Sequence, residues 1–333
     1  MMFHPGIFAL LLGSGLTAAM LCYSAYEGLR IIRSWDIACG SEQQLELERK
    51  TYLISTVMSY AMGFQLLSLF LFIYTADTLS PLFIGAMCAA GSLNVNGFGY
   101  PTLMVKIGSC LLAGLWLIVN STDNRAHDYP LIRIKYWLLL LIAPLLLVET
   151  TLQGLYLLSL RPNIITSCCA VLFNADADTA MSDLLALPHW PALAIFFVSA
   201  PMTLATGLYV YLKAKGAILF AITTLCHFVI SMVALISFIS IYFYELPTHH
   251  CPFCLLHQEY GYIGYLLYAT ILVGAISGMG VGVIHPFRSV ASLHHVIPPM
   301  QKKLAMISLS ATLVFMLIAG YAILFSNLSM ALQ

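Results

Sequence analysis

Long apolar runs separated by short polar segments recur along the chain, and none shows the period-two alternation of a membrane β-strand. A hydrocarbon core of about 30 Å requires roughly 20 apolar residues of helix. The pattern therefore predicts eight spanning helices, at about 7–29, 52–74, 102–120, 133–159, 189–212, 216–244, 256–283 and 304–326. The expected fold class is all-α, a polytopic membrane helix bundle forming a single integral membrane domain over residues 1–333.

The composition agrees with this pattern. Only 8% of the residues are charged and 61% are hydrophobic, whereas soluble domains carry about 25% charged residues. The net charge is zero and neither end has a basic or acidic tail, which argues against nucleic acid as a partner. The lipid bilayer is the expected partner. The first apolar run is expected to be a retained helix, because Met1–Pro5 lacks the positive residues of a signal peptide.

The basic residues are distributed unevenly between the two predicted faces. Alternate connections hold twelve of the fourteen, namely Arg30, Arg33, Arg49, Lys50, Arg125, Arg133, Lys135, Lys213, Lys215, Arg288, Lys302 and Lys303. Arg161 lies on the opposite side, with Lys106 just inside a helix. Basic residues accumulate in cytoplasmic loops. We therefore expect both termini on the outer side of a bacterial cytoplasmic (inner) membrane.

Cysteine is concentrated in the three outer loops of this topology. These loops are residues 75–101, 160–188 and 245–255, and they contain Cys88, the pair Cys168 and Cys169, and the pair Cys251 and Cys254. Disulfides form and persist on the export side of a membrane. We expect the loops to converge into a cysteine-bearing cap facing the periplasm or exterior.

The segment from His249 to Tyr260 carries the strongest chemical signal. We expect Cys251 to begin the seventh helix, with Pro252 in its first turn. Residues three apart share a helix face, and the amide-rich start of a helix favours thiolate. The same helical stripe continues through Gln258, Tyr262 and Tyr265. These three residues are expected to contact a quinone ring at the depth of the lipid head groups, although tyrosines there also form ordinary aromatic belts.

Two ionisable residues fall deep within predicted spans. Glu149 lies in the fourth span and His227 in the sixth. Such residues are candidates for functional sites. They could form a proton path that serves cofactor binding and redox chemistry, or they could be satisfied by hydrogen bonds between helices. In the seventh span, Gly274, Gly278, Gly280 and Gly282 predict close helix contact.

The cysteines allow two further interpretations. Thiolate and imidazole bind transition metals, and Cys251, Cys254, His249, His250 and His257 could supply such a site together with Cys88 or Cys168. Alternatively, the cysteines form disulfides that only stabilise the structure.

The run Cys251-Pro252-Phe253-Cys254-Leu255-Leu256-His257-Gln258 resembles the Cys-Pro-Leu-Cys-Ile-Leu-Gln-Arg type segment of the DsbB family. It is more loosely similar to the vitamin K epoxide reductase family. Both are membrane thiol–disulfide oxidoreductases with four-helix cores, and DsbB-type enzymes pass electrons from periplasmic thiols to a quinone. The resemblance implies that Cys251 and Cys254 are the quinone-proximal pair. It also implies that Cys168, Cys169 or Cys88 forms the shuttle pair.

The leading hypothesis is therefore a redox-active electron-transport enzyme that exchanges electrons between outer-face cysteines and a membrane quinone. Its partner would be a periplasmic thiol protein. One alternative is a metal-binding or electron-transfer subunit of a membrane complex. The other is a structural membrane subunit with stabilising disulfides.

Overall fold

The computed structural model describes residues 4–36, 41–166 and 189–328. Helices are the only regular elements among these residues, apart from one isolated β-bridge between Ile84 and Ile165. Eight of the described helical segments are long and apolar enough to cross a membrane. The prediction of eight long apolar helices is therefore confirmed among these residues, and the helices indicate an integral membrane protein.

The eight long helices are α1 (Pro5–Ser34), α2 (Glu42–Thr78), α4 (Gly99–Asp123), α5 (Ile132–Leu158), α8 (His189–Lys213), α9 (Ala217–Ala234), α11 (Ile263–Ile284) and α12 (Ile297–Phe325). A π-helix (Leu235–Ile239) and α10 (Ser240–Tyr244) extend α9. The short elements are α3 (Ala89–Leu93) and 3₁₀ turns at Ser80–Leu82, Cys254–Leu256, Gln258–Tyr260 and His285–Ser289.

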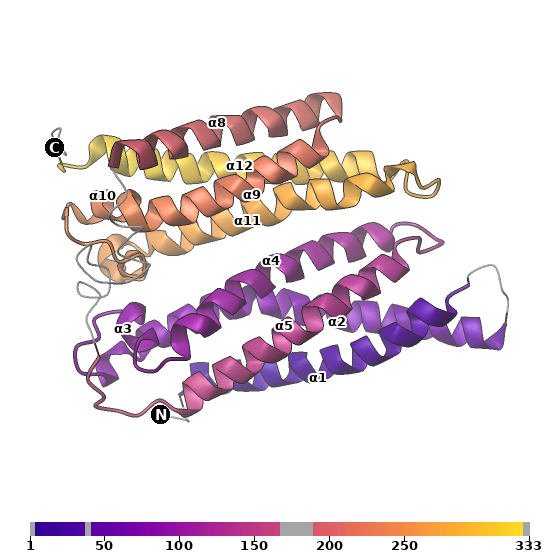
Figure 1. Cartoon of the computed structure of the whole chain (residues 1–333), viewed down its shortest axis with the longest axis horizontal. Helices are drawn as coiled ribbons and strands as arrows, with labels where there is room; N and C mark the ends of the chain where they lie inside the picture. Colours follow the sequence, from indigo (N-terminus) through magenta and orange to yellow (C-terminus); the bar gives the residue numbers. More distant parts are fainter. Residues whose placement is uncertain (1–3, 37–40, 167–188, 329–333) are drawn as a thin grey trace. The chain divides into compact units, whose positions relative to one another are not determined.

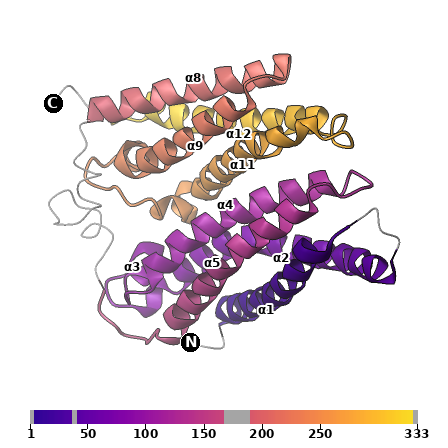
Figure 2. The ribbon, with the colours of Figure 1, turned by 45° about the vertical axis from the view of Figure 1, so that its right-hand side comes forward.

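The chain groups into two compact units. Unit 1 comprises Met1–Thr75, Leu93–Pro162 and Pro286–Pro299, and unit 2 comprises Ala76–Ser92, Asn163–His285 and Met300–Gln333. In unit 1, α1, most of α2, α4 and α5 run side by side, as do α8, α9, α11 and α12 in unit 2 (Figures 1 and 2). Each unit thus contributes four of the apolar helices. A single integral membrane domain over residues 1–333 stays a prediction.

Unit 1 encloses two ion pairs within its apolar core. The Lys106 Nζ atom lies 2.7 Å from Glu149 Oε1 and 2.7 Å from Ser68 Oγ. The Lys135 Nζ atom lies 2.8 Å from Asp123 Oδ2, and both of these side chains are fully buried. Each cation joins helices by contacts that compensate the removal of its charge from water.

Lys135 lies inside a helix. The charge pattern grouped it with the loops, but it is buried in the first turn of α5. Burial is compatible with its charge because the Asp123 carboxylate, at the end of α4, pairs with it. That carboxylate also accepts a hydrogen bond of 2.8 Å from the Leu131 amide. The predicted span at 133–159 already contains Lys135, and grouping this residue with the connections was wrong.

Glu149 makes hydrogen bonds to neighbouring helices, as expected if it is a structural residue and not part of a proton path. Its carboxylate accepts hydrogen bonds from Lys106 and Ser109 on α4 and from Gln65 on α2. This network joins three helices of unit 1. The geometry therefore gives Glu149 a structural role, and a role in cofactor binding stays a prediction.

In unit 2, glycines bring the helices close together. A Cβ atom added at Gly282 of α11 would lie 2.4 Å from the Ala221 Cβ atom on α9, and one at Gly278 would lie 2.5 Å from Thr224 Oγ1. No side chain fits at these separations without a shift. The close contact predicted from the glycines of the seventh span is confirmed.

The buried ion pair in unit 1 provides a stability test. Glu149→Gln leaves the Lys106 ammonium buried without an anion, so we expect a loss of about 3–5 kcal/mol in unfolding free energy. The double variant Lys106→Met/Glu149→Leu should recover much of this loss, because no uncompensated charge remains. Thermal unfolding of the purified protein in detergent measures both effects.

The matched control is Glu46→Gln. Glu46 pairs with Lys50 through a side chain that is 61% exposed, and water screens such a pair, so this variant should unfold like the wild type. Equal thermal stability of Glu149→Gln and wild type would contradict the role assigned to the buried pair.

Candidate functional site: a cluster of three cysteines

The segment that follows α2 pairs with the start of the second predicted outer loop. The Ile84 amide donates to the Ile164 carbonyl at 3.0 Å, and the Thr166 amide donates to the Ile84 carbonyl at 2.9 Å. Gly85 lies between these contacts with φ of +90°, and a Cβ atom there would lie 2.5 Å from the Thr166 carbonyl oxygen. Only glycine suits this position. Two of the three predicted outer loops are therefore joined.

The third predicted loop places its two cysteines beside Cys88 of the first. The Sγ atoms of Cys88, Cys251 and Cys254 all lie within 4.8 Å of one another. Those of Cys88 and Cys251 are 3.5 Å apart. The residues are 0%, 0% and 8% exposed. The sulfurs therefore form a buried cluster, built from segments 163 residues apart in sequence.

Cys168 and Cys169 lie outside the described residues. The described part of their loop ends at Thr166, whose hydroxyl donates to the Gly91 carbonyl at 3.0 Å. The first and third predicted loops therefore meet at their cysteines, Cys88 on one side and Cys251 and Cys254 on the other. The participation of Cys168 and Cys169 stays a prediction.

Two tyrosine hydroxyls hold the backbone of the Cys-x-x-Cys segment. Tyr244, the last residue of α10, donates to the Cys251 carbonyl at 2.5 Å. Tyr268 of α11 donates to the Pro252 carbonyl at 2.7 Å. Gly264 permits close approach, since a Cβ atom there would lie 2.9 Å from the Leu255 backbone. The ends of two helices therefore fix the position of Cys251.

The segment does not begin a helix, so that prediction was wrong. Cys254–Leu256 and Gln258–Tyr260 are separate 3₁₀ turns, and α11 begins only at Ile263. Gly261 and Tyr262 have φ of +61° and +57°, a left-handed conformation that an α-helix cannot contain. The apolar residues before them are buried in turns, and hydropathy alone does not distinguish buried turns from helix.

The predicted helical stripe through the cysteines and tyrosines is also absent. Gln258 is exposed in a 3₁₀ turn and Tyr262 is 52% exposed. Tyr265 follows in α11, with its ring centre 6.4 Å from that of Tyr262. Because the turn at Gly261 interrupts the segment, these residues do not continue a helical face from Cys254. Their contact with a quinone stays a prediction.

Asp77, which the sequence analysis did not identify, links the two cysteine segments. Its Oδ1 atom accepts hydrogen bonds from His257 Nε2 at 2.9 Å and from the Ala89 amide at 3.0 Å. Ala89 follows Cys88, and His257 follows Cys254 by three residues. One carboxylate therefore fixes both sides of the cluster. An aspartate near the end of a span gives no sequence signal of this role.

The three neighbouring histidines contact groups other than the sulfurs. His250 Nδ1 donates to the Ser237 carbonyl in the π-helix at 3.0 Å, and burial lowers the pKa of His250. The His249 ring packs 4.6 Å from the Tyr244 ring, and His257 pairs with Asp77. In the described part of the chain, the group of ligand atoms close enough for a metal consists of the three cysteines alone.

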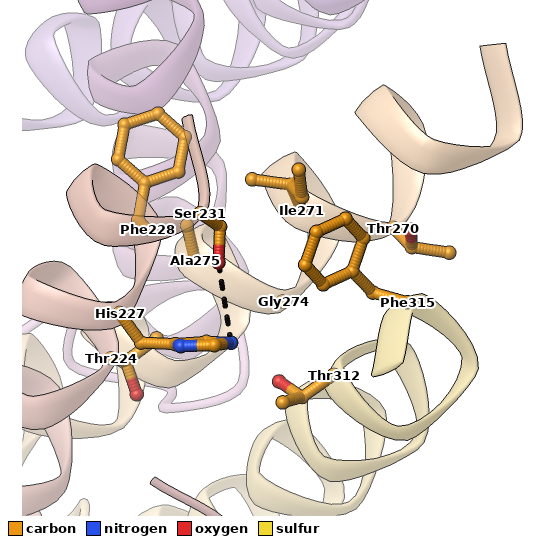
Figure 3. A pocket seen from close by; sticks show the side chains of 10 residues that line it. All are labelled: Thr224, His227, Phe228, Ser231, Thr270, Ile271, Gly274, Ala275, Thr312 and Phe315. Carbon is orange, nitrogen blue, oxygen red and sulfur yellow. Dashed lines mark hydrogen bonds between the residues drawn. The ribbon is translucent and has the colours of Figure 1, made fainter. Parts of the chain in front are cut away.

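His227 lines a separate small cavity in unit 2, between α9, α11 and α12 (Figure 3). Its Nδ1 atom lies 3.0 Å from Ser199 Oγ on α8, and its Nε2 atom lies 3.4 Å from Ser231 Oγ. The rings of Phe196 and Phe315 pack around it. His227 therefore has hydrogen-bond partners between helices, and a role toward a cofactor stays a prediction.

No protein-family model, curated protein or solved structure matches the chain. Function is therefore inferred from the chemistry of the residues that the fold brings together. The cysteine cluster is the group with the greatest chemical reactivity among them, because thiolates are both nucleophiles and metal ligands.

The Asp77 contact can be tested by cross-linking. In a Cys254→Ala background, a mild thiol oxidant should join Cys88 to Cys251, since their sulfurs are 3.5 Å apart. Asp77→Ala should slow this reaction about tenfold, because loss of a charge-assisted hydrogen bond costs about 1.5–3 kcal/mol. Mass spectrometry of the linked peptides measures the rate.

Asp77→Asn keeps a side-chain oxygen acceptor and should retain most of the rate. Glu259→Ala removes an exposed carboxylate from the same segment and serves as the control. Equal cross-linking rates in Asp77→Ala and Glu259→Ala would rule out the positioning role.

Proposed function

We propose that the protein is a membrane thiol–disulfide oxidoreductase that passes electrons from the thiols of an outer-face partner protein to a membrane quinone. The observation that carries this proposal is the contact between Cys88 and Cys251, with Cys254 in the same buried cluster. A cysteine of one segment is thereby placed against a Cys-x-x-Cys pair of another. This arrangement suits exchange of a disulfide between segments.

The exchange step is a thiolate attack. In the oxidised enzyme, Cys251 and Cys254 share a disulfide, and the Cys88 thiolate attacks the Cys251 sulfur. The Cys88–Cys251 bond forms, the Cys251–Cys254 bond breaks, and Cys254 leaves as the thiolate. This step moves a disulfide without net oxidation. The short separation of the Cys88 and Cys251 sulfurs supports it.

Net oxidation couples two half-reactions. Two thiols of the partner protein form a disulfide and reduce an enzyme disulfide to two thiols. The quinone then accepts two electrons and two protons from the enzyme dithiol and becomes a quinol, which restores the enzyme disulfide. The shuttle pair that meets the partner protein is proposed to come from Cys168, Cys169 and Cys88, as the resemblance to the DsbB family implies.

The surroundings of the cluster support this assignment. Unit 2 contributes four apolar helices, the number in the core of the DsbB-type enzymes that the motif resembles. Aromatic rings lie beside the cysteine segment, with the Tyr244 ring 4.8 Å from that of Tyr260. A planar quinone ring stacks favourably on such aromatic faces. We propose that the quinone ring binds near Tyr260 and is reduced there by the enzyme dithiol.

Activity can be measured with a small dithiol as electron donor and a short-chain quinone as acceptor. Replacing any one of Cys88, Cys251 and Cys254 by alanine should lower the rate of quinone reduction at least about a hundredfold. When residues act as a unit, the loss of one costs about as much as the loss of all. Cys254→Ala should also trap a disulfide at Cys251, since the leaving thiolate that reverses the exchange is gone.

Cys110→Ala is the matched control, because Cys110 is buried in α4 of unit 1. This variant should keep full activity. If the three cluster variants lower only the abundance of the protein, and quinone reduction per molecule is unchanged, the cysteines are structural and the proposal is wrong.

The cysteine cluster is proposed to face the periplasm of a bacterial cytoplasmic membrane, as the basic residues of the opposite loops favour. Gln258 and Lys213 are both exposed. Lys213 ends α8, and Gln258 lies in the turn before α11. Because α9 runs between these two connections, the residues lie at opposite ends of the helices of unit 2. In intact cells, a membrane-impermeant thiol reagent should label Gln258→Cys but not Lys213→Cys. Labelling of Lys213→Cys alone would reverse the proposed orientation.

A further inference from the structure

We infer that the reduced cysteine cluster is a binding site for one thiophilic divalent metal ion, with Zn²⁺ as the appropriate probe. The three ligands are Cys88, Cys251 and Cys254. The inference rests on the proposed function only in one respect: the catalytic cycle passes through a state in which these sulfurs are thiols.

The spacing of the sulfurs fits a common ion. Zinc binds thiolate sulfur at about 2.3 Å, so two sulfurs on one tetrahedral ion are about 3.8 Å apart. The Cys88 and Cys251 sulfurs are 3.5 Å apart, and all three lie within 4.8 Å of one another. Shifts of a few tenths of an ångström to about one ångström would place all three on one ion. Side-chain rotation is sufficient for such shifts.

Charge favours a divalent ion. Three thiolates so close together repel one another strongly in a buried site, where the effective dielectric constant is low. A divalent ion reduces the charge of the trio from −3 to −1, whereas a monovalent ion leaves −2. The soft sulfur ligands select zinc and related metals over magnesium or calcium. Three protein ligands also leave a fourth position for water or another exchangeable group.

The histidines stand outside the ligand set, because among the described residues the ligand atoms close enough for one metal are the three sulfurs alone. His257 pairs with Asp77 and His250 donates to a backbone carbonyl. The structure thus replaces the mixed cysteine and histidine site considered from the sequence with one of three thiolates. This difference makes the ligand set testable residue by residue.

Metal binding would regulate the exchange reaction. A bound ion holds Cys251 and Cys254 as metal-bound thiolates and slows formation of the Cys251–Cys254 disulfide that Cys88 attacks. Oxidation of the Cys251 and Cys254 thiolates by a quinone transfers two electrons, consumes two protons and forms quinol. The new disulfide removes two of the three ligands and releases the ion. Zinc would therefore inhibit the reduced enzyme, and oxidation would reverse the inhibition.

The experiment uses the full-length protein in detergent, reduced and then freed of reductant. Equilibration with chelator-buffered Zn²⁺ followed by elemental analysis should give one zinc per chain. Cys88→Ala, Cys251→Ala and Cys254→Ala should each weaken binding by more than the roughly tenfold to hundredfold cost of losing an outer-shell partner. Co²⁺ in place of zinc should show thiolate-to-cobalt charge-transfer absorption that the variants lose.

Three controls define the ligand set. Cys110→Ala, His249→Ala and the double variant Cys168→Ser/Cys169→Ser should bind zinc like the wild type. Identical elution of all variants in size-exclusion chromatography shows that folding is retained. Oxidised wild-type protein should bind no zinc at the cluster.

Retention of zinc by all three cluster variants, or its loss only in Cys168→Ser/Cys169→Ser, would overturn the inference. The two proposals fail separately. Zinc binding as expected, with quinone reduction unaffected by Cys251→Ala, would refute the oxidoreductase and leave the metal site. If quinone reduction depends on Cys251 but the reduced protein binds no zinc, the metal site is refuted and the oxidoreductase stands.

Discussion

The chemistry of this protein depends on the contact between Cys88 and the Cys251–Cys254 segment. Cys88 follows the end of α2, whereas the Cys-x-x-Cys segment lies between α10 and α11. Neither segment is part of a long helix, so the helix–helix packing of unit 2 does not by itself place the sulfurs. Backbone pairing, two tyrosine hydroxyls and the Asp77 carboxylate provide the positioning.

The polar groups of the two units serve different purposes. In unit 1, Lys106 and Lys135 are each paired with a carboxylate, and the pairs join helices in an environment that penalises isolated charge. In unit 2, Asp77 and His257 are partly exposed and hold reactive segments together. Buried charge in this chain therefore supports the structure, whereas the reactive groups of the cluster are sulfurs that are neutral as thiols.

Disulfide exchange and metal binding draw on the same property of the cluster. Sulfurs at about van der Waals contact are close enough for one to attack another after a small movement, and they are also close enough to share one ion. The two uses are mutually exclusive, because a disulfide removes ligands, whereas a bound metal needs all three sulfurs as thiolates. Oxidation of the cluster would therefore release the metal ion, and a bound ion would hold the three cysteines in their reduced form.

The sequence by itself determined the membrane class, the eight long apolar helices and the close packing along the seventh, because length, hydropathy and glycine spacing are local properties. It also identified the cysteines. It misplaced Cys251 on a helix and grouped Lys135 with the connections, since hydropathy does not reveal the left-handed turn at Gly261 or a partner carboxylate on another helix. Only the tertiary structure decided that Cys88 meets Cys251 and that Asp77 joins their segments, because those contacts link residues 163 and 180 positions apart.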